Sequence, residues 1–356
     1  MDTHARYAQN ISQLFIEALT EEGEKWRKPW DDSGFTPFGQ FNPLSGSSYR
    51  GGNQLLLTFT AHKNGYTDNR WLTFKQARSV GAKVKKGEKA TLIRYYGEKT
   101  VDVQKDDGTM DQEKRKMYSY ACVFNGDQIE GLPKVEQKPP QTIDGIMAID
   151  KLIDESGVPL HFDGMGRAFY RPKTDSIHLP PQEKFHSTED YYATVLHELG
   201  HATGHEKRLN RDLTGRPGSL EYAREELRAE ISSFMMGSRL GVNMPLGQNK
   251  IYVKQWAKIL QDQPSEILKA CSDAEKICQY LKIPLPEQEK LVPKYQRTPA
   301  EKQAQVLEHA NKTHSNSKKH FAKKRQEKVR KMQQEDEQVQ AREKRQRKSQ
   351  EQSQTL

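Results

Sequence analysis

The chain has 356 residues, of which 57 are basic and 48 acidic, so its formal charge is +9, and only 34% of the residues are apolar. No segment approaches the roughly 20 consecutive apolar residues of a membrane-spanning helix, and the first ten residues lack the apolar stretch of a signal peptide. These features exclude an integral membrane protein and predict a cytoplasmic location without a membrane partner. Three scattered cysteines are too few for a disulfide framework.

The positive charge is concentrated at the C-terminal end. Residues 301–356 carry a net charge of +7, which leaves +2 for the first 300 residues. Residues 311–350 contain few large apolar side chains, so they bury too little surface to offset the entropy of ordering. We therefore predict a basic low-complexity tail over 286–356, either a solvated helix or disordered. Such a tail is a spacer, or it holds nucleic acid through the phosphates.

A Pro-rich polar segment at 133–142 predicts a linker between two domains. The first domain, residues 1–132, is expected to be α+β. It should start with an amphipathic helix over 4–21, because apolar residues recur there at helical spacing. The remaining predicted elements are short helices at 54–61 and 73–80 and strands at 90–96, 99–104 and 117–124, with turns at Gly97 and at 106–108.

The second domain, residues 143–285, is predicted to be mostly helical with a small sheet. A helix should end at Ser156-Gly157. Short strands are expected near Leu160 and at 168–170 and 176–179, followed by helices at 188–203, 220–240, 250–261 and 265–281. A small sheet followed by helices is the order found in zincin-like metallohydrolases, although other α+β domains share it.

The most specific motif is His197-Glu-Leu-Gly-His201. Histidines at i and i+4 of a helix place two imidazoles on one face, which is half of a zinc site. Glu198 is then positioned to act as the general base toward a water that the ion has made acidic. The alternative interpretation is two surface histidines on a structural helix.

A third ligand has to come from elsewhere in the chain. The metzincin pattern would require a histidine at position 207, but Lys207 stands there, so that class is excluded. A following helix offers three glutamates in Tyr222-Ala-Arg-Glu-Glu-Leu-Arg-Ala-Glu230. Small residues accompany Glu226 and Glu230 on one face and would allow close helix packing. We assign Glu226 as the ligand and Glu230 as the acceptor that orients a ligand imidazole; the alternative is a charged, solvated face.

Side chains near the motif are weaker candidates. Tyr170, Tyr222 and His178 are candidates for steadying an oxyanion, although a lone aromatic residue is more often part of the packing. A ligand set of two nitrogens and one oxygen suits Zn²⁺, and Mn, Co or Ni are also compatible with it.

The first domain has a basic and aromatic segment. Nine Lys and Arg residues occur between Arg70 and Lys99 against two glutamates, interleaved with Trp71, Phe74, Tyr95 and Tyr96. Cations that follow phosphates and aromatic rings that stack on unpaired bases are the requirements of single-stranded DNA binding. The alternatives are that Trp71 belongs to the core and that residues 83–89 form a charged turn.

Several strings in the first domain resemble the N-terminal domain of ArdC-type antirestriction proteins, which is itself similar to a region of plasmid TraC primases. They are Asn42-Pro-Leu-Ser-Gly, Tyr49-Arg-Gly-Gly-Asn53, Trp71-Leu-Thr-Phe-Lys-Gln-Ala77 and Val84-Lys-Lys-Gly-Glu-Lys89. The histidine motif, Arg208-Leu-Asn-Arg211 and the 222–230 string resemble that family's zincin-like metallopeptidase domain. The resemblance covers about residues 5–283.

The resemblance implies a protein of conjugative plasmids that binds single-stranded DNA and protects incoming DNA from host restriction. It implies metal ligation by His197, His201 and a downstream acidic residue, with Glu198 as the catalytic carboxylate. The candidate substrate is a host restriction-related protein. The sequence leaves open whether proteolysis occurs. Candidate DNA contacts are Tyr49, Arg50, Asn53, Trp71, Lys75, Lys83, Lys85, Lys86, Lys89, Arg94, Tyr95 and Tyr96. The alternatives are a DNA-occluding factor with a structural metal and a primase-associated accessory module.

Overall fold

The structure is a computed structural model. It describes residues 2–20, 39–104, 110–133, 142–163, 166–242, 250–286, 288 and 290–291. Almost all of the predicted tail, most of the predicted linker and the predicted turn at 106–108 lie outside these residues. Helices and small sheets together form an α+β protein, as the sequence predicts.

The helices are α1 (Thr3–Thr20), α3 (Gly51–Asn64), α4 (Phe74–Ser79), α5 (Thr142–Ser156), α6 (Thr188–Ala202), α7 (Leu220–Leu240), α8 (Lys250–Asp262) and α9 (Glu266–Tyr280), with 3-10 turns at Gly126–Gln128 and Gln182–Lys184. The strands are β1 (Phe41–Asn42), β2 (Ser47–Ser48), β3 (Trp71–Thr73), β4 (Lys83–Val84), β5 (Thr91–Gln104), β6 (Met110–Asn125), β7 (Ile129–Glu130), β8 (Leu160–His161), β9 (Phe169–Arg171) and β10 (Ser176–His178). The predicted helices agree with these bounds to within about three residues.

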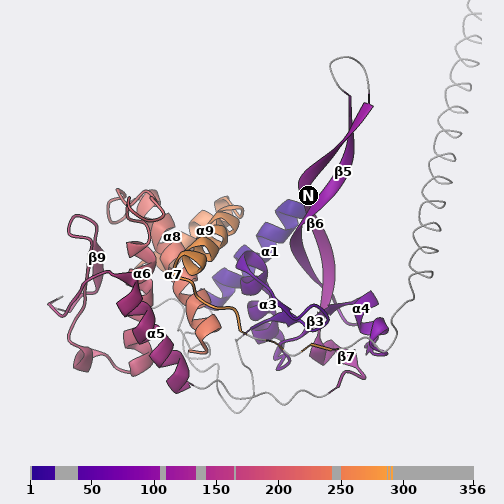
Figure 1. Cartoon of the computed structure of the whole chain (residues 1–356), viewed down its shortest axis with the longest axis horizontal. Coiled ribbons are helices and arrows are strands. Elements are labelled where there is room, and N and C mark those ends of the chain that lie inside the picture. Colours follow the sequence, from indigo (N-terminus) through magenta and orange to yellow (C-terminus); the bar gives the residue numbers. More distant parts are fainter. Residues whose placement is uncertain are drawn as a thin grey trace, which may run out of the picture. The chain divides into compact units, whose positions relative to one another are not determined.

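The first half is organised around the long antiparallel pair of β5 and β6. Strand β3 extends the pair into a sheet of order β3-β6-β5, and the far end of the pair projects away from the helices (Figure 1). The predicted turn at Gly97 is wrong. Gly97 pairs in register with Met117 in an unbroken ladder. A glycine weakens a strand but, unlike a proline, keeps the backbone N–H that the ladder needs.

The second half places a small sheet beside helix α6. Strand β10 is central, parallel to β8 and antiparallel to β9, and these strands confirm the three predicted near Leu160, at 168–170 and at 176–179. Helix α6 is capped by Ser187, whose side chain accepts from the Asp190 amide, and α7 ends at Gly241 in the left-handed conformation. These caps fix where the motif helix and its neighbour begin and end.

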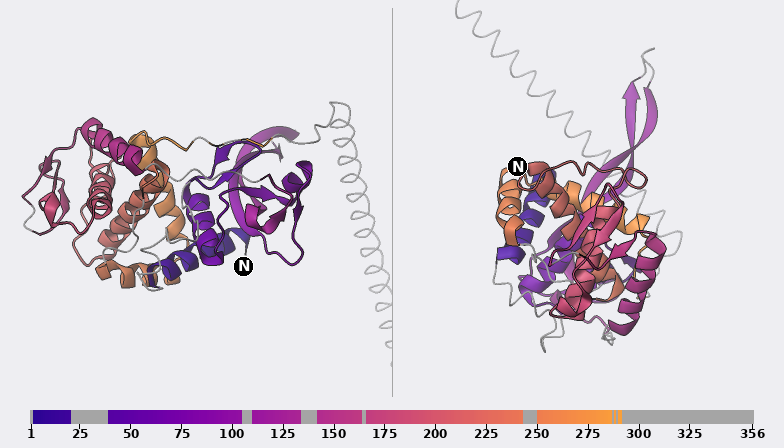
Figure 2. Two further views of the ribbon diagram at one scale, coloured as in Figure 1. Left: turned by 90° about the horizontal axis from the view of Figure 1, so that it is seen from below. Right: turned by 90° about the vertical axis from the view of Figure 1, so that its left-hand side faces the viewer.

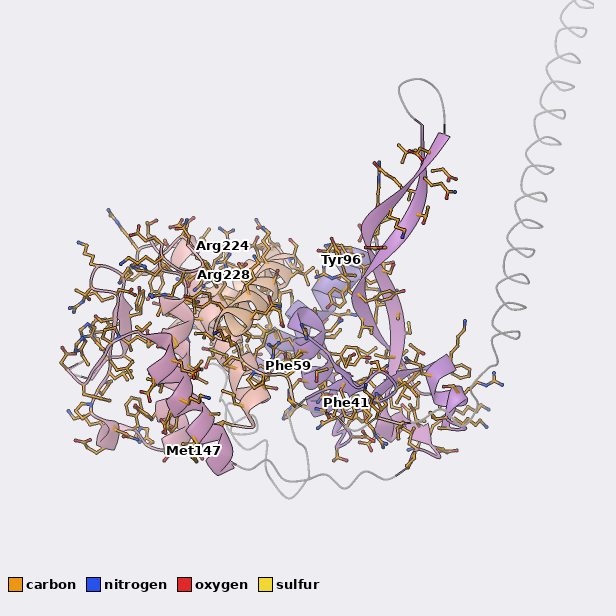
Figure 3. All side chains as sticks on the ribbon, viewed as in Figure 1. Phe41, Phe59, Tyr96, Met147, Arg224 and Arg228 are labelled. Atoms are coloured by element: carbon orange, nitrogen blue, oxygen red, sulfur yellow. The ribbon has the colours of Figure 1, made fainter. Side chains whose placement is uncertain are left out.

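One hydrophobic core continues from the first half into the second. Helices α1 and α3 pack against α8 and α9, and the two views of Figure 2 show these helices side by side. Phe15 of α1 lies 6.5 Å from Trp256 of α8, and Phe59 of α3 lies 5.6 Å from Phe234 of α7, ring centroid to ring centroid. Figure 3 shows Phe59 between the two halves. The division at 133–142 remains a prediction, but the helices it separates share their apolar faces.

None of the helices in the described part of the chain has the length and apolar character needed to cross a membrane. Cys271 and Cys278 are buried on α9 as free thiols.

Candidate metal centre

Helix α6 presents His197 and His201 on one face, with ring centroids 4.9 Å apart. This face can approach α7 closely because Gly200 lies at the contact. A Cβ at that position would meet the Ser232 Oγ at 2.7 Å. The Ser233 hydroxyl donates to the Ala193 carbonyl across the same contact, at 3.2 Å. The prediction that small residues on α7 permit close packing is confirmed.

Glu226 of α7 faces the outer nitrogens of both imidazoles. One carboxylate oxygen lies 3.5 Å from His197 Nε2, and the other lies 3.3 Å from His201 Nε2. One ligand atom from each of these three residues falls within 4.8 Å of the other two. Two imidazole nitrogens and a carboxylate oxygen at this spacing fit the protein ligands of a catalytic divalent-metal site, which leaves a further coordination position open.

The inner nitrogen of each imidazole faces a second carboxylate. His197 Nδ1 lies 3.5 Å from Glu230, and His201 Nδ1 lies 3.3 Å from Glu225. A carboxylate at Nδ1 fixes the ring orientation and the tautomer that directs Nε2 toward an ion. The position of Glu230 is the one that the sequence argument assigned to it.

Burial and charge pairing oppose each other at this cluster. Burial by itself would lower the pKa of both histidines, but the facing carboxylates hold the pKa of His197 well above its usual value and raise that of His201 to about 9. Burial would likewise raise the pKa of the Glu226 carboxyl, but the two imidazoles lower it. The cluster therefore favours an ionised carboxylate with positive charge beside it, and a bound cation satisfies the same requirement.

Glu198 lies on the same helix and lines the pocket that contains the ligand face. Its side chain is 6% exposed, and burial raises its pKa although both histidines act in the opposite direction. The backbone of Tyr170, on strand β9, provides a hydrogen bond to the carboxylate. A buried carboxylate with a raised pKa next to a metal site has the properties of a general base.

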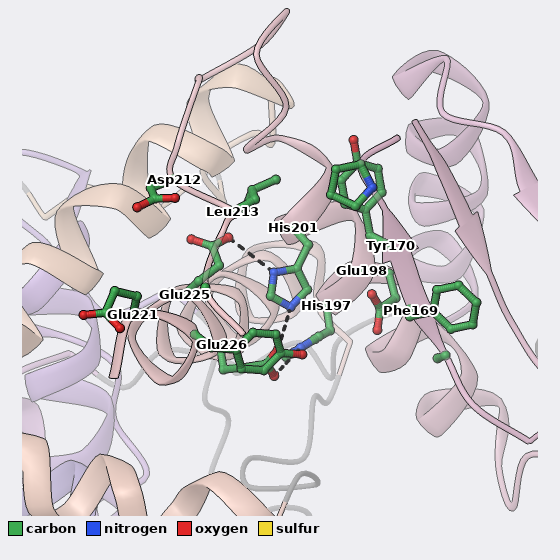
Figure 4. A pocket seen from close by; sticks show the side chains of 14 residues that line it. Phe169, Tyr170, His197, Glu198, His201, Asp212, Leu213, Glu221, Glu225 and Glu226 are labelled. Carbon is green, nitrogen blue, oxygen red and sulfur yellow. Dashed lines mark hydrogen bonds and ion pairs between the residues drawn. The ribbon is translucent and has the colours of Figure 1, made fainter. Parts of the chain in front are cut away.

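The pocket has a volume of about 210 Å³ and opens between α6, α7 and β9 (Figure 4). It is lined by Ala168, Phe169, Tyr170, Pro172, His197, Glu198, His201, Asp212, Leu213, Gly215, Glu221, Tyr222, Glu225 and Glu226.

The three candidates for steadying an oxyanion separate in the structure. Tyr222 lies in the pocket beside Glu226, and burial raises its pKa, with the negative charge of Glu226 adding to the effect. The Tyr170 hydroxyl instead donates to Asp175 at 2.8 Å, so only its backbone serves the site. His178 does not line the pocket; its Nδ1 lies 2.7 Å from Asp163. Tyr222 is the candidate that stays beside the ligands, and its hydroxyl is hydrogen-bonded to Glu226.

Sequence reasoning missed the role of Glu225 and of the arginine that holds it. Arg211 donates to Glu225 at 2.7 Å and also to the Gly200 carbonyl and the Thr203 hydroxyl. Arg211 thus joins the end of α6 to the carboxylate that orients His201. The sequence feature that could have indicated this role is the string Arg208-Leu-Asn-Arg211. Its charged residues do not follow the periodicity of a helix or a strand.

The predicted DNA-contact residues fall into separate groups in the structure. Arg50, Asn53 and Arg94 line a second cavity, and both Tyr95 and Tyr96 are exposed. The exposed lysines at 75, 83, 85, 86 and 89 lie on other parts of the first half.

One of the predicted contacts is in the interior and another is partly buried. Trp71 is fully buried, with its indole N–H donated to Gln40, and the half-buried Tyr49 packs on the same apolar cluster as Trp71. The Trp71 ring has no face open to a base, so the prediction that it stacks on DNA is corrected: it is a core residue.

Two partly buried histidines lie one helical turn apart, with a carboxylate from the neighbouring helix and a further glutamate beside them. Together they define a zincin-like metal centre on an α+β scaffold. Residues 147–273 match the family described as zincin-like metallopeptidase, and residues 5–124 match the N-terminal domain of anti-restriction factor ArdC. The chain belongs to the ArdC antirestriction family.

Solved structures with this fold include the ArdC protein of plasmid R388, metal-free and Mn(II)-bound. The metal-free form has a TM-score of 0.61 and 33% identity, over 77% of this chain and 96% of that one. The Mn(II)-bound form has a TM-score of 0.61 and 32% identity, over 79% and 97%. The DNA primase TraC of Escherichia coli is 40% identical over 79% of this chain. This chain spans only about a fifth of that primase, 20% of its length.

Proposed function

We propose that this protein is a metal-dependent peptidase of the antirestriction response, with His197, His201 and Glu226 as the ligands. The observation that carries the proposal is the convergence of the two Nε2 atoms on the Glu226 carboxylate, inside a pocket that also holds Glu198. Zn²⁺ suits this donor set, and Mn²⁺, which the R388 relative binds, is compatible with it.

His197, His201 and Glu226 would hold a divalent ion, which would supply Lewis-acid polarisation of a substrate carbonyl and a more acidic water. The chain's own groups do the rest. Glu198 accepts the proton from the attacking water and returns it to the leaving amine, and Glu225 and Glu230 keep the imidazoles aligned. The Tyr222 hydroxyl, which is hydrogen-bonded to Glu226, would donate instead to the oxygen that gains charge in the transition state.

The test of catalysis is Glu198→Gln, which keeps the shape of the side chain but removes the base. We expect the metal content to stay unchanged, while hydrolysis and protection of incoming DNA fall by roughly 10²- to 10⁴-fold, the usual contribution of a general base. Glu221→Gln at the pocket rim is the matched control. Full protection by Glu198→Gln with metal bound would show that the metal is structural and that the protein acts by occluding DNA.

The ArdC-like half is proposed to bind single-stranded DNA in the cytoplasm, where incoming plasmid DNA meets host restriction enzymes. The support is its family, together with its exposed lysines and the exposed pair of Tyr96 on β5 and Tyr118 on β6. A host restriction-related protein is the proposed peptidase substrate. Binding to single-stranded and duplex oligonucleotides, titrated with salt, tests the DNA part: equal affinity for both, or no binding at low salt, contradicts it.

A further inference from the structure

A cavity of about 360 Å³ lies where the ArdC-like half meets helix α9 of the peptidase-like half. Arg50, Arg94 and Lys276 bring three positive charges to its lining, against the single carboxylate of Glu275. That carboxylate is already engaged, because it accepts from Arg239 and from the Gly51 amide at the start of α3. The cavity therefore has a net positive charge that its own acidic group does not neutralise.

The cations in this cavity are available to a ligand. Within the described residues, no ion pair is found for either Arg50 or Arg94. Lys276 pairs with Asp273 at 2.9 Å, but the lysine side chain is 61% exposed, and such surface pairs contribute at most about 1 kcal/mol. An incoming phosphate can displace Asp273 at little cost.

An aromatic surface continues from the cavity along one face of the hairpin. The Arg94 guanidinium lies 4.3 Å from the ring centroid of Tyr118 and 5.2 Å from that of Tyr7. Tyr96 and Tyr118 are paired across the two strands with their centroids 5.3 Å apart, edge to face. They are 61% and 52% exposed, so aromatic surface remains open to a base.

Strand geometry restricts this surface to one side of the hairpin. Neighbouring residues of a strand point to opposite faces, so Arg94 and Tyr96 share a face that Tyr95 does not. The position of Tyr95 agrees, since its ring lies 3.7 Å from where a Cβ of Gly97 would be. Asn53 ties the face to α3, because its side-chain carbonyl accepts from both the Arg94 amide and the Tyr7 hydroxyl.

We propose that a single DNA strand binds along this face, with unpaired bases on Tyr96 and Tyr118 and an adjacent phosphate in the cavity between Arg50, Arg94 and Lys276. The inference rests on the proposed single-stranded DNA binding. It adds that the binding surface formed by Tyr96, Tyr118, Arg50 and Arg94 continues onto α9 at Lys276. Helix α9 thereby makes the peptidase-like half part of the DNA interface. Cations that follow the backbone next to aromatic rings that accept any base are the general solution for binding a single strand without sequence preference.

The phosphate contact is tested by Lys276→Glu in the metal-loaded full chain, with fluorescence anisotropy of an oligothymidine. Lys269→Glu is the matched control: Lys269 lies seven residues earlier on α9, is 62% exposed and has its own i,i+3 acidic partner, but does not line the cavity. We expect Lys276→Glu to weaken binding about tenfold and to reduce the slope of log K against log salt by about 0.7, the value for one phosphate of a single strand. Lys269→Glu should change neither quantity appreciably.

The stacking contact is tested by Tyr96→Ala against Tyr95→Ala, two exposed tyrosines that are adjacent in sequence and on opposite faces. Loss of a stacked base should weaken binding by roughly tenfold for Tyr96→Ala and leave the salt slope unchanged, with little effect for Tyr95→Ala. If the wild type binds the single strand and each variant binds as tightly as its control, the proposed position of the strand on this face is wrong, while the proposed DNA binding stands. If the wild type binds no single strand at low salt, both fall.

Discussion

At the metal centre the Glu226 side chain is almost fully enclosed, whereas on the hairpin Tyr96 and Tyr118 expose more than half of their surface. The enclosed residues already contact each other: each imidazole touches one carboxylate through Nε2 and another through Nδ1. On the hairpin, the contacts of the Arg94 guanidinium among the described residues are with two aromatic rings, Tyr7 and Tyr118, and it has no ion pair there. The side chains at the metal centre are already held in position for a small ion. The rings and the guanidinium on the hairpin keep exposed surface that a large, flexible ligand can contact.

This difference has a consequence for mutations. In the centre, a substitution leaves a buried partner unsatisfied, so it should change metal affinity, stability or both. On the hairpin face, a substitution removes a group that water already contacts, so it should change binding and little else. The following predictions test that contrast, from the largest expected effect to the smallest.

Glu226→Ala should have the largest effect, because it removes one of three ligands and leaves two imidazoles facing an empty space. We expect metal affinity to fall by more than the roughly 10–100-fold that loss of an outer partner causes. Metal content after dialysis, with titration calorimetry, measures this change. If Glu226→Ala still binds one metal ion per chain, the third ligand is another residue and the assignment of Glu226 is wrong.

Arg211→Ala should destabilise the fold by about 3 kcal/mol, the typical cost of breaking a buried ion pair. Arg211 holds Glu225, and both side chains are nearly buried, 11% and 8% exposed. Urea unfolding of the metal-free protein measures the free energy. Arg228→Ala is the comparison, since its pair with Asp273 has side chains 21% and 22% exposed and should contribute less. An equal loss of unfolding free energy in the two variants would contradict the expectation that the more buried pair contributes more.

The sequence was most informative where function depends on local spacing. His197, Glu198 and His201 lie within one helical turn, so the period of the helix alone places them together. Glu226 and Glu230 could be assigned because they share one face of the next helix. Arg211 could not, because it lies in the loop after α6 and its partners come from the end of α6 and from α7, and only tertiary packing brings these together.

The DNA interface was less predictable for the same reason. Composition cannot tell an exposed aromatic ring from a buried one, so Trp71 and Tyr96 looked equivalent. Only the sheet shows that Trp71 faces the core and that Tyr118, absent from the predicted contacts, lies opposite Tyr96. Lys276 lies far away in sequence, and its position at the cavity depends on the packing of α3 against α9.

Glu230→Gln should lower metal affinity by about 10–100-fold, as expected for the partner of a ligand imidazole. The amide still accepts from His197 Nδ1 but no longer supplies charge, so the ion should bind in the same geometry with weaker affinity. Calorimetry gives the affinity, and the absorption spectrum of the Co²⁺-substituted protein reports the geometry. An unchanged affinity would mean that Glu230 orients His197 by shape alone.

Asp175→Asn should cost about 1–2 kcal/mol at neutral pH, through its charged hydrogen bonds with Arg208. Burial would raise the pKa of Asp175, but the hydrogen bonds from Arg208 and Tyr170 lower it. The stabilisation is therefore complete above the unfolded pKa of about 3.9 and is lost as the pH falls through the lower folded value.

Asparagine suits the exchange because position 175 has a positive φ of 49°, which Asn tolerates as well as Asp. Urea unfolding at pH 7 and at pH 3 should show the difference between wild type and Asp175→Asn shrinking in acid. A difference that is constant with pH would assign the effect to packing.

Tyr96→Ala should have the smallest effect on stability, less than about 1 kcal/mol, because only an edge contact with Tyr118 is lost from an exposed ring. The same variant is expected to lose DNA affinity, whereas Arg211→Ala should lose stability first. Thermal unfolding of the two proteins, read beside oligonucleotide binding, separates these outcomes. If Tyr96→Ala unfolds as readily as Arg211→Ala, then Tyr96 stabilises the fold. The hairpin face is then a structural element and not an open interface, and the contrast with the enclosed metal centre is wrong.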